Sequence, residues 1–139
     1  MSHALASSLS VAVILGLVAC TTTVEPSKPV TVRTVSATLD RPSGTVATVP
    51  YIVANDGAVP IRLIGSCGDD PAARVERQAG HGWVPYAGGV CLATQLAGLL
   101  LLPPGAARQG TVSLTEAGDY RLRMLTERGD VVSATFHVR

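Results

Sequence analysis

The sequence has few of the features that mark nucleic-acid-binding or disordered proteins. Only 4% of its 139 residues are aromatic, 15% are charged, and the net charge is +1. Binding to phosphate backbones needs clustered cations and usually aromatic side chains that stack on bases, and here the aromatic residues stand singly. Disorder is excluded because 47% of the residues are hydrophobic and the charges balance. Nucleic acid is therefore not an expected partner.

Motifs of the common catalytic classes are also missing. The chain has no G-x-S-x-G, no H-E-x-x-H and no glycine-rich phosphate loop. Beyond the N-terminal segment the histidines are His81 and His137, and the alternation of the last strand places His137 on its outward face. We therefore expect neither catalytic residues nor a cofactor.

Residues 1–19 contain no Asp, Glu, Lys or Arg, and residues 11–19 form an unbroken apolar run that ends at Cys20. Nine residues are too few for a membrane-spanning helix, which needs about 20. The run instead fits the hydrophobic region of a secretory signal, closed by small residues at its cleavage site. The alternative is an apolar strand or core segment that ends in a cysteine.

The segment Leu17-Val18-Ala19-Cys20 resembles the lipobox of bacterial lipoproteins, in which the cysteine thiol is diacylated and becomes the mature N-terminus. The first ten residues differ from that pattern in having no Lys or Arg. The resemblance implies a signal peptide at 1–19 and an anchor to membrane lipid through Cys20. Thr21, in place of Asp, implies the outer membrane in a Gram-negative cell.

Residues 20–29 are polar, contain proline and show no apolar period, which predicts a semi-extended tether. The nine residues after Cys20 reach about 30 Å at most. The domain that begins at Val30 is therefore expected to sit close to the membrane surface.

Three cysteines occur in the chain, and if Cys20 carries lipid, Cys67 and Cys91 remain as a pair. An even number of cysteines in an exported chain predicts a disulfide. The loop is 25 residues long, counted inclusively, which corresponds to roughly 3.5 kcal/mol in the chain-entropy model. The alternative is a metal site, whose candidate ligands are Cys67, Asp69, Asp70, His81 and Cys91. No C-x-x-C or H-x-x-x-H spacing supports it, so we expect no metal.

From Val30 onward apolar residues alternate with period two, which predicts β-strands. The expected strands are 30–39, 45–55, 60–66, 73–78, 83–87, 96–102, 110–115, 119–126 and 131–138. Seven to nine short strands with frequent turn signals predict an antiparallel β-sandwich over 30–139. The alternation changes parity between Val32 and Val35, which a bulge or a change of sheet explains. Residues 91–102 fit either a strand or a short helix.

Near the C-terminus, Leu114, Gly118 and Tyr120 resemble the tyrosine corner of immunoglobulin-like and fibronectin-type sandwiches. The resemblance implies that the Tyr120 hydroxyl bonds to the backbone across the corner. Residues 101–105, Leu-Leu-Pro-Pro-Gly, are similar to the strand and turn of bacterial immunoglobulin-like modules, including the BsuPI-type proteinase-inhibitor domain. Position 122 is Leu, so the usual inter-sheet cysteine is missing and Cys67–Cys91 is expected to be a local cross-link.

Candidate partner-binding residues are His81, Trp83 and Tyr86, which lie near a glycine-flanked turn. For Trp83 we favour the simpler interpretation, that it packs into the sandwich core beside the disulfide. The sequence thus predicts a non-catalytic binding or structural module of the cell envelope, with an envelope protein or surface partner. Two rival functions are a protease inhibitor that uses the excursion from Gly68 to Val90, and a metal carrier built on the region of Cys67, His81 and Cys91.

Overall fold

The computed structural model describes residues 30–87 and 97–139, and every regular element in these ranges is a β-strand. The strands are β1 (Val30–Thr34), β2 (Thr38–Leu39), β3 (Ala47–Asn55), β4 (Ile61–Cys67), β5 (Arg74–Ala79), β6 (Gly82–Ala87), β7 (Ala97–Leu102), β8 (Ala107–Leu114), β9 (Gly118–Met124), β10 (Val131–Val132) and β11 (Phe136–Val138). The predicted signal peptide, Cys20 and the tether lie outside the described residues, as do residues 91–96; residues 97–102 form a strand.

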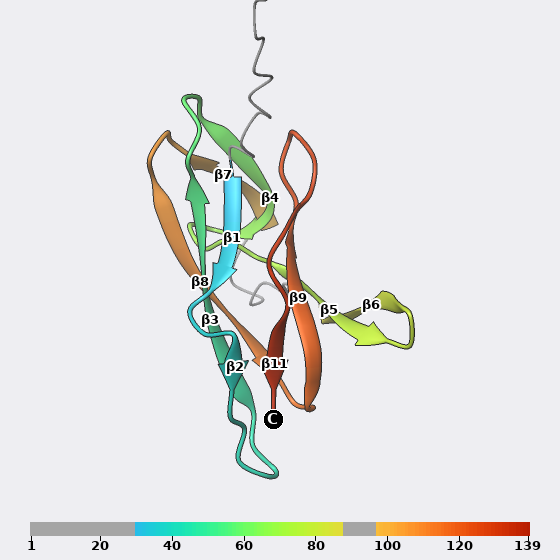
Figure 1. Cartoon of the computed structure of the whole chain (residues 1–139). Coiled ribbons are helices and arrows are strands. Elements are labelled where there is room, and N and C mark those ends of the chain that lie inside the picture. Colours follow the sequence, from blue (N-terminus) through green and yellow to red (C-terminus); the bar gives the residue numbers. More distant parts are fainter. Residues whose placement is uncertain (1–29, 88–96) are drawn as a thin grey trace, which may run out of the picture.

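The strands form two facing layers around one core (Figure 1). In one layer β3 lies between β1 and β8, antiparallel to both. In the other, β9 lies between β11 and β5, β6 extends the sheet beyond β5, and β2 joins β11 as a parallel edge strand. This pairing order is that of an immunoglobulin-like sandwich. The predicted fold class, an all-β antiparallel immunoglobulin-like sandwich, is confirmed.

The expected first strand, 30–39, divides between the layers. Val30 and Val32 are buried in β1, whereas Val35 is exposed and the chain crosses to β11 through the turn that follows. The parity change between Val32 and Val35 therefore marks a change of sheet. The expected strand 131–138 divides into β10 and β11, which both pair with β9 in the same sheet.

β4 and β7 form a separate two-stranded sheet at the end of the sandwich where β1 begins (Figure 1). β4 also lies beside the chain that follows β9, since the Ile64 amide donates to the Leu125 carbonyl at 2.9 Å. The chain then turns at Cys67 and Asp70, whose amides and carbonyls bond reciprocally, before it pairs with β9 as β5.

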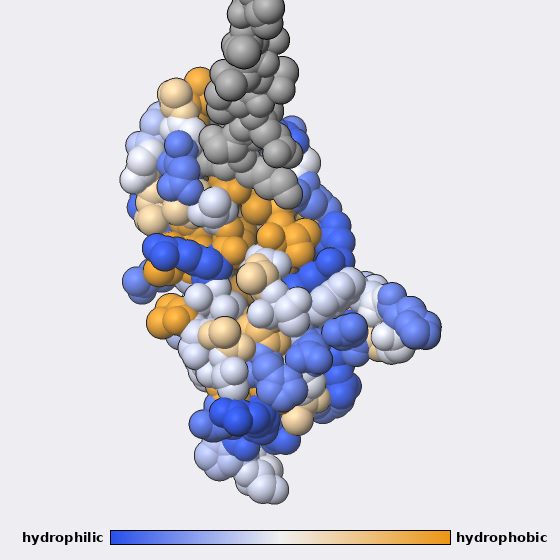
Figure 2. Space-filling view, viewed as in Figure 1, coloured by the Kyte–Doolittle hydropathy of each residue, from blue (hydrophilic) through white to orange (hydrophobic). Residues whose placement is uncertain are grey.

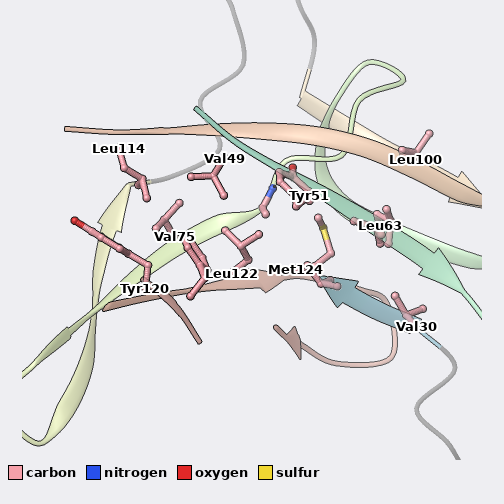
Figure 3. Close-up of a cluster of buried hydrophobic side chains, with 14 of the residues drawn as sticks. Val30, Val49, Tyr51, Leu63, Val75, Leu100, Leu114, Tyr120, Leu122 and Met124 are labelled. Carbon is pink, nitrogen blue, oxygen red and sulfur yellow. Dashed lines mark hydrogen bonds between the residues drawn. The ribbon is translucent and has the colours of Figure 1, made fainter. Parts of the chain in front are cut away.

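Alternate residues of both layers meet in the core, and Figure 3 shows several of them converging between the sheets. The fully buried large side chains are Tyr51, Tyr120, Phe136, Ile61, Leu63, Leu102, Leu114, Leu122, Met124, Val30, Val49 and Val53. Tyr51 also ties β3 to the segment before β5, because its buried hydroxyl donates to the Pro71 carbonyl and accepts from the Ala73 amide.

Candidate binding site on the β5–β6 hairpin

The β5–β6 hairpin projects sideways from the sandwich (Figure 1). Ala79 pairs with Gly82, so Gly80 and His81 form a two-residue turn. Gly80 has φ of +59°, a backbone conformation that glycine adopts without strain and that two-residue hairpins need at their first position. His81 is consequently exposed at the hairpin tip. Within the described residues β6 pairs with β5 alone, so its outer edge is open.

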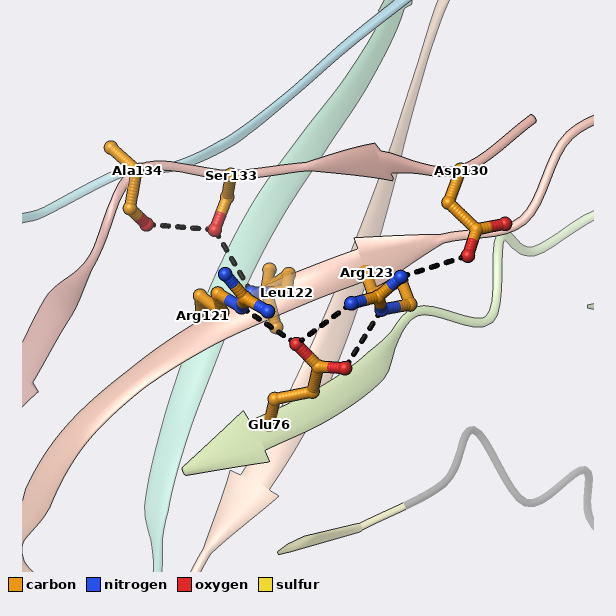
Figure 4. Close-up of polar contacts among 7 residues, drawn as sticks. All are labelled: Glu76, Arg121, Leu122, Arg123, Asp130, Ser133 and Ala134. Carbon is orange, nitrogen blue, oxygen red and sulfur yellow. Dashed lines mark hydrogen bonds and ion pairs between the residues drawn. The ribbon is translucent and has the colours of Figure 1, made fainter. Parts of the chain in front are cut away.

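Glu76 is the centre of an ion-pair cluster on the outer face of this sheet (Figure 4). Its carboxylate accepts from Arg121 Nε at 2.6 Å and from Arg123 Nε at 2.7 Å, and Arg123 also donates to Asp130 at 2.9 Å. Burial opposes ionisation of Glu76, but the bonds from Arg123 and Arg121 outweigh it and hold the pKa of Glu76 below its ordinary value. The same bonds to Glu76 and Asp130 raise the pKa of Arg123.

Trp83 lies on that outer face, half-buried, with the Arg121 guanidinium 4.5 Å from the centre of its ring. This is a cation–π contact, which needs the aromatic face to lie against a cation. The expectation that Trp83 packs into the sandwich core is therefore wrong. The register explains the difference, because Trp83 is opposite Gln78 and both strands turn this position away from the core.

Tyr86 lies on the inner side of the hairpin, beyond the bulge between Val75 and Glu76. Its ring meets Tyr120 edge-on at 5.2 Å, and its hydroxyl is 2.9 Å from Thr115 Oγ1. Arg77 covers both tyrosine rings and forms an ion pair with Glu116. The predicted partner-binding residues are thus separated: His81 lies at the tip, Trp83 on the outer face and Tyr86 on the inner side.

Tyr120 donates its hydroxyl to the Glu116 carbonyl at 2.8 Å, across the turn that joins β8 to β9. Leu114 is fully buried at the end of β8, and Gly118 begins β9 with φ of +151°. Burial, followed by the nearby Tyr86, raises the pKa of Tyr120 to about 12. The phenol is therefore protonated throughout the physiological range and acts as a structural donor.

A cleft of about 400 Å³ opens beside the bulge of the hairpin. Its lining residues are Arg74, Val75, Glu76, Pro85, Tyr86, Arg123 and Asp130. Arg74 is exposed and, unlike Arg123, forms no ion pair within the part of the chain that the structure describes. The cleft therefore combines an apolar wall of Val75, Pro85 and Tyr86 with one cation that is available to an anionic group.

Of the residues considered for a metal site, Cys67 and Asp70 are bridge partners, whereas His81 lies at the hairpin tip. Residues 30–87 and 97–139 contain no group of three or more His, Cys, Asp or Glu side chains that could hold a metal ion. Cys67 is buried at the end of β4, and Cys91 lies outside the described residues. His137, which was not among these candidates, pairs with Asp119, with 2.7 Å between Nδ1 and Oδ1.

Sequence reasoning missed the role of Glu76 and that of Asn55, which is fully buried in β3. The Asn55 amide nitrogen donates to the carbonyls of Val59 and Leu102, and its oxygen accepts from the Gly57 amide. The available signal for Asn55 was a lone polar residue at a core-facing position of an alternating strand.

No helix in the described ranges is long and apolar enough to cross a membrane.

Comparisons with known proteins name no family. No protein-family model matches the chain, and no curated protein is similar to it. Among solved structures, it is similar to a mutant β-glucosidase from Listeria innocua, with 15% identity and a TM-score of 0.39 over 79% of this chain. The chain spans 16% of that enzyme's length. It is also similar to PapD-like domain 7 of human CEP192, with 13% identity, a TM-score of 0.37, and coverage of 95% and 94% of the two chains. These values are too low to indicate a shared activity.

Proposed function

We propose that this protein is a membrane-anchored lipoprotein of the cell envelope that carries a non-catalytic immunoglobulin-like binding module. The lipobox-like segment ending at Cys20 supports the anchor, and the tether of residues 21–29 keeps the sandwich near the membrane. In a Gram-negative cell that membrane is the outer one. The partner is an envelope or surface protein.

The β5–β6 hairpin is the binding element of this proposal. The observation that carries it is the projecting hairpin, whose β6 edge is open within the described residues and whose base holds the cleft beside Arg74. An extended segment of a partner can add to such an edge through backbone hydrogen bonds. Pro85 lacks an amide donor, which limits the register of that pairing. A carboxylate on the partner would pair with Arg74.

Photo-crosslinking in intact cells tests this assignment. A photoreactive benzoyl-phenylalanine replaces Val84, which is 44% exposed on β6, and a matched control replaces Val46, which is 53% exposed before β3. We expect one recurrent crosslinked protein from position 84 and at least a fivefold lower yield from position 46. Equal yields at the two positions, or no crosslink at 84, would contradict a binding role for the hairpin.

The disulfide between Cys67 and Cys91 stays a prediction and has its own test. A digest of non-reduced protein should contain the two cysteine peptides joined, and reduction should separate them. Two thiols that alkylate without reduction, together with stoichiometric metal, would instead favour the metal carrier.

The rival function of protease inhibitor has a separate test. It would be favoured if the purified protein slows a protease and this inhibition is lost when Gly80 and His81 are replaced.

A further inference from the structure

Three large aliphatic side chains lie exposed together on the outer face of the β4–β7 sheet. Ile64 and Leu99 are cross-strand partners, and Leu101 lies two residues further along β7 on the same face. Their exposed fractions are 40%, 64% and 51%, respectively. We call these three residues the β4–β7 apolar face.

The core does not account for this apolar face. Leu63, Leu100 and Leu102 point inward from the same two strands and are buried. An antiparallel sheet with one covered side normally carries polar residues on its other side. Only alternate leucines of β7 therefore pack into the core. The outward-facing Leu99 and Leu101 are available for another contact.

The tether enters the domain at this end of the sandwich. Val30, the first described residue, pairs with Asn55, whose side-chain amide donates to the Leu102 carbonyl at 2.9 Å. Leu102 is the neighbour of Leu101, so the start of β1 and the apolar face lie at one end, as Figure 1 shows for β1, β4 and β7. In Figure 2 apolar residues gather in the middle of the visible face, below the grey atoms, whereas the tip opposite the tether is mostly hydrophilic.

Charge does not oppose contact between this face and lipid. Arg62 is the cross-strand partner of Leu101 in the same outward row, and its guanidinium pairs with Glu127 at 3.1 Å.

A control position for lipid contact lies at the far end of β3. This strand has nine residues, so its two ends, Asn55 and Ala47, are about 27 Å apart. Val46, next to Ala47, is therefore far from the tether.

We propose that the β4–β7 apolar face rests on the membrane to which the protein is anchored, with Leu99 and Leu101 in contact with lipid. This inference rests on the proposed lipid anchor at Cys20. Three aliphatic side chains make a weak contact by themselves, but a tether of at most about 30 Å holds them at high effective concentration near the bilayer. The contact orients the domain, and the β5–β6 hairpin remains free to meet a partner.

Fluorescence quenching by brominated lipid tests the contact. The full chain is produced in bacteria, extracted from membranes, and reconstituted into phosphatidylethanolamine–phosphatidylglycerol vesicles with brominated acyl chains. Trp83→Phe removes the native tryptophan, and Leu99→Trp, Leu101→Trp and the control Val46→Trp are added singly. We expect brominated lipid to lower the tryptophan fluorescence at positions 99 and 101 at least twofold and to leave the fluorescence at position 46 unchanged.

Three results would overturn the inference, and they are distinguishable. Flotation with the vesicles reports the anchor. If the protein floats but the tryptophan fluorescence at positions 99 and 101 is not quenched, the contact is contradicted and the anchor is not. Blue-shifted, unquenched emission there would indicate that a second copy of the chain covers the face. Protein that fails to float would contradict the anchor, and the membrane contact that depends on it.

Discussion

Single hydroxyl and carboxylate groups connect separate strands and turns of the fold. Tyr120 joins β9 to the turn after β8, and Tyr51 joins β3 to the chain before β5. Glu76 joins β5 to two arginines of β9. Each of these groups is largely buried, so the loss of one leaves a partner without its bond and is costly.

Tyr120→Phe should lower the free energy of unfolding by about 1–2 kcal/mol, because the variant loses the part-buried hydrogen bond to the Glu116 carbonyl. The denaturation midpoint in urea measures the change. Tyr86→Phe is the matched control, since its hydroxyl bonds to Thr115 in an exposed position and its loss should cost less than about 0.5 kcal/mol. Equal midpoints for wild type and Tyr120→Phe would contradict the structural role of this hydroxyl.

Glu76 should make stability depend on pH. A carboxyl whose folded pKa lies below its unfolded value, near 4.5, stabilises the fold above that pH and loses this contribution as the pH falls through the folded value. Glu76→Gln should therefore cost about 1–3 kcal/mol at pH 7 and flatten the stability profile below pH 4.5.

Thermal unfolding between pH 7 and pH 3 measures the Glu76 contribution. Glu127→Gln is the control, because its partner Arg62 is exposed and such a pair contributes little. If the wild type and Glu76→Gln keep the same difference in stability at every pH, the carboxylate is not the stabilising group.

At the scale of elements, the close pairing of β3 with β8 depends on a glycine. A Cβ atom at Gly110 would lie 2.4 Å from the Tyr51 ring, so the ring occupies the space above this residue. Gly110→Ala should destabilise the protein by about 1–3 kcal/mol through the forced shift of a buried ring. Gly82→Ala, where nothing lies within 4 Å, should change stability far less. Similar denaturation midpoints for the two variants would contradict the packing of Tyr51 over β8.

The alternation of apolar residues predicted the strands well, because a half-buried strand must turn every second residue inward. The parity change between Val32 and Val35 indicated either a bulge or a change of sheet, and the chain does change sheets there. The pairing of Glu76 with Arg121 and Arg123 could not be predicted, since it depends on the register of β5 against β9. Trp83 was misassigned for the same reason: its face follows from the hairpin register, whereas its residue type alone favours the core.

The two proposed contacts lie on different parts of the sandwich. The tether and the β4–β7 apolar face share one end, and the β5–β6 hairpin projects from the side (Figure 1). A module built in this way can touch lipid and a partner protein simultaneously. The membrane contact depends on the anchor at Cys20.

Mass spectrometry of the N-terminal peptide tests the anchor most directly, on full-length protein produced in bacteria and extracted from their membranes. We predict a peptide that begins at Cys20 and carries a diacylglyceryl group, and we expect Cys20→Ser to yield no acylated peptide. A peptide that still joins Ala19 to an unmodified Cys20 in the wild-type protein would contradict the lipid anchor.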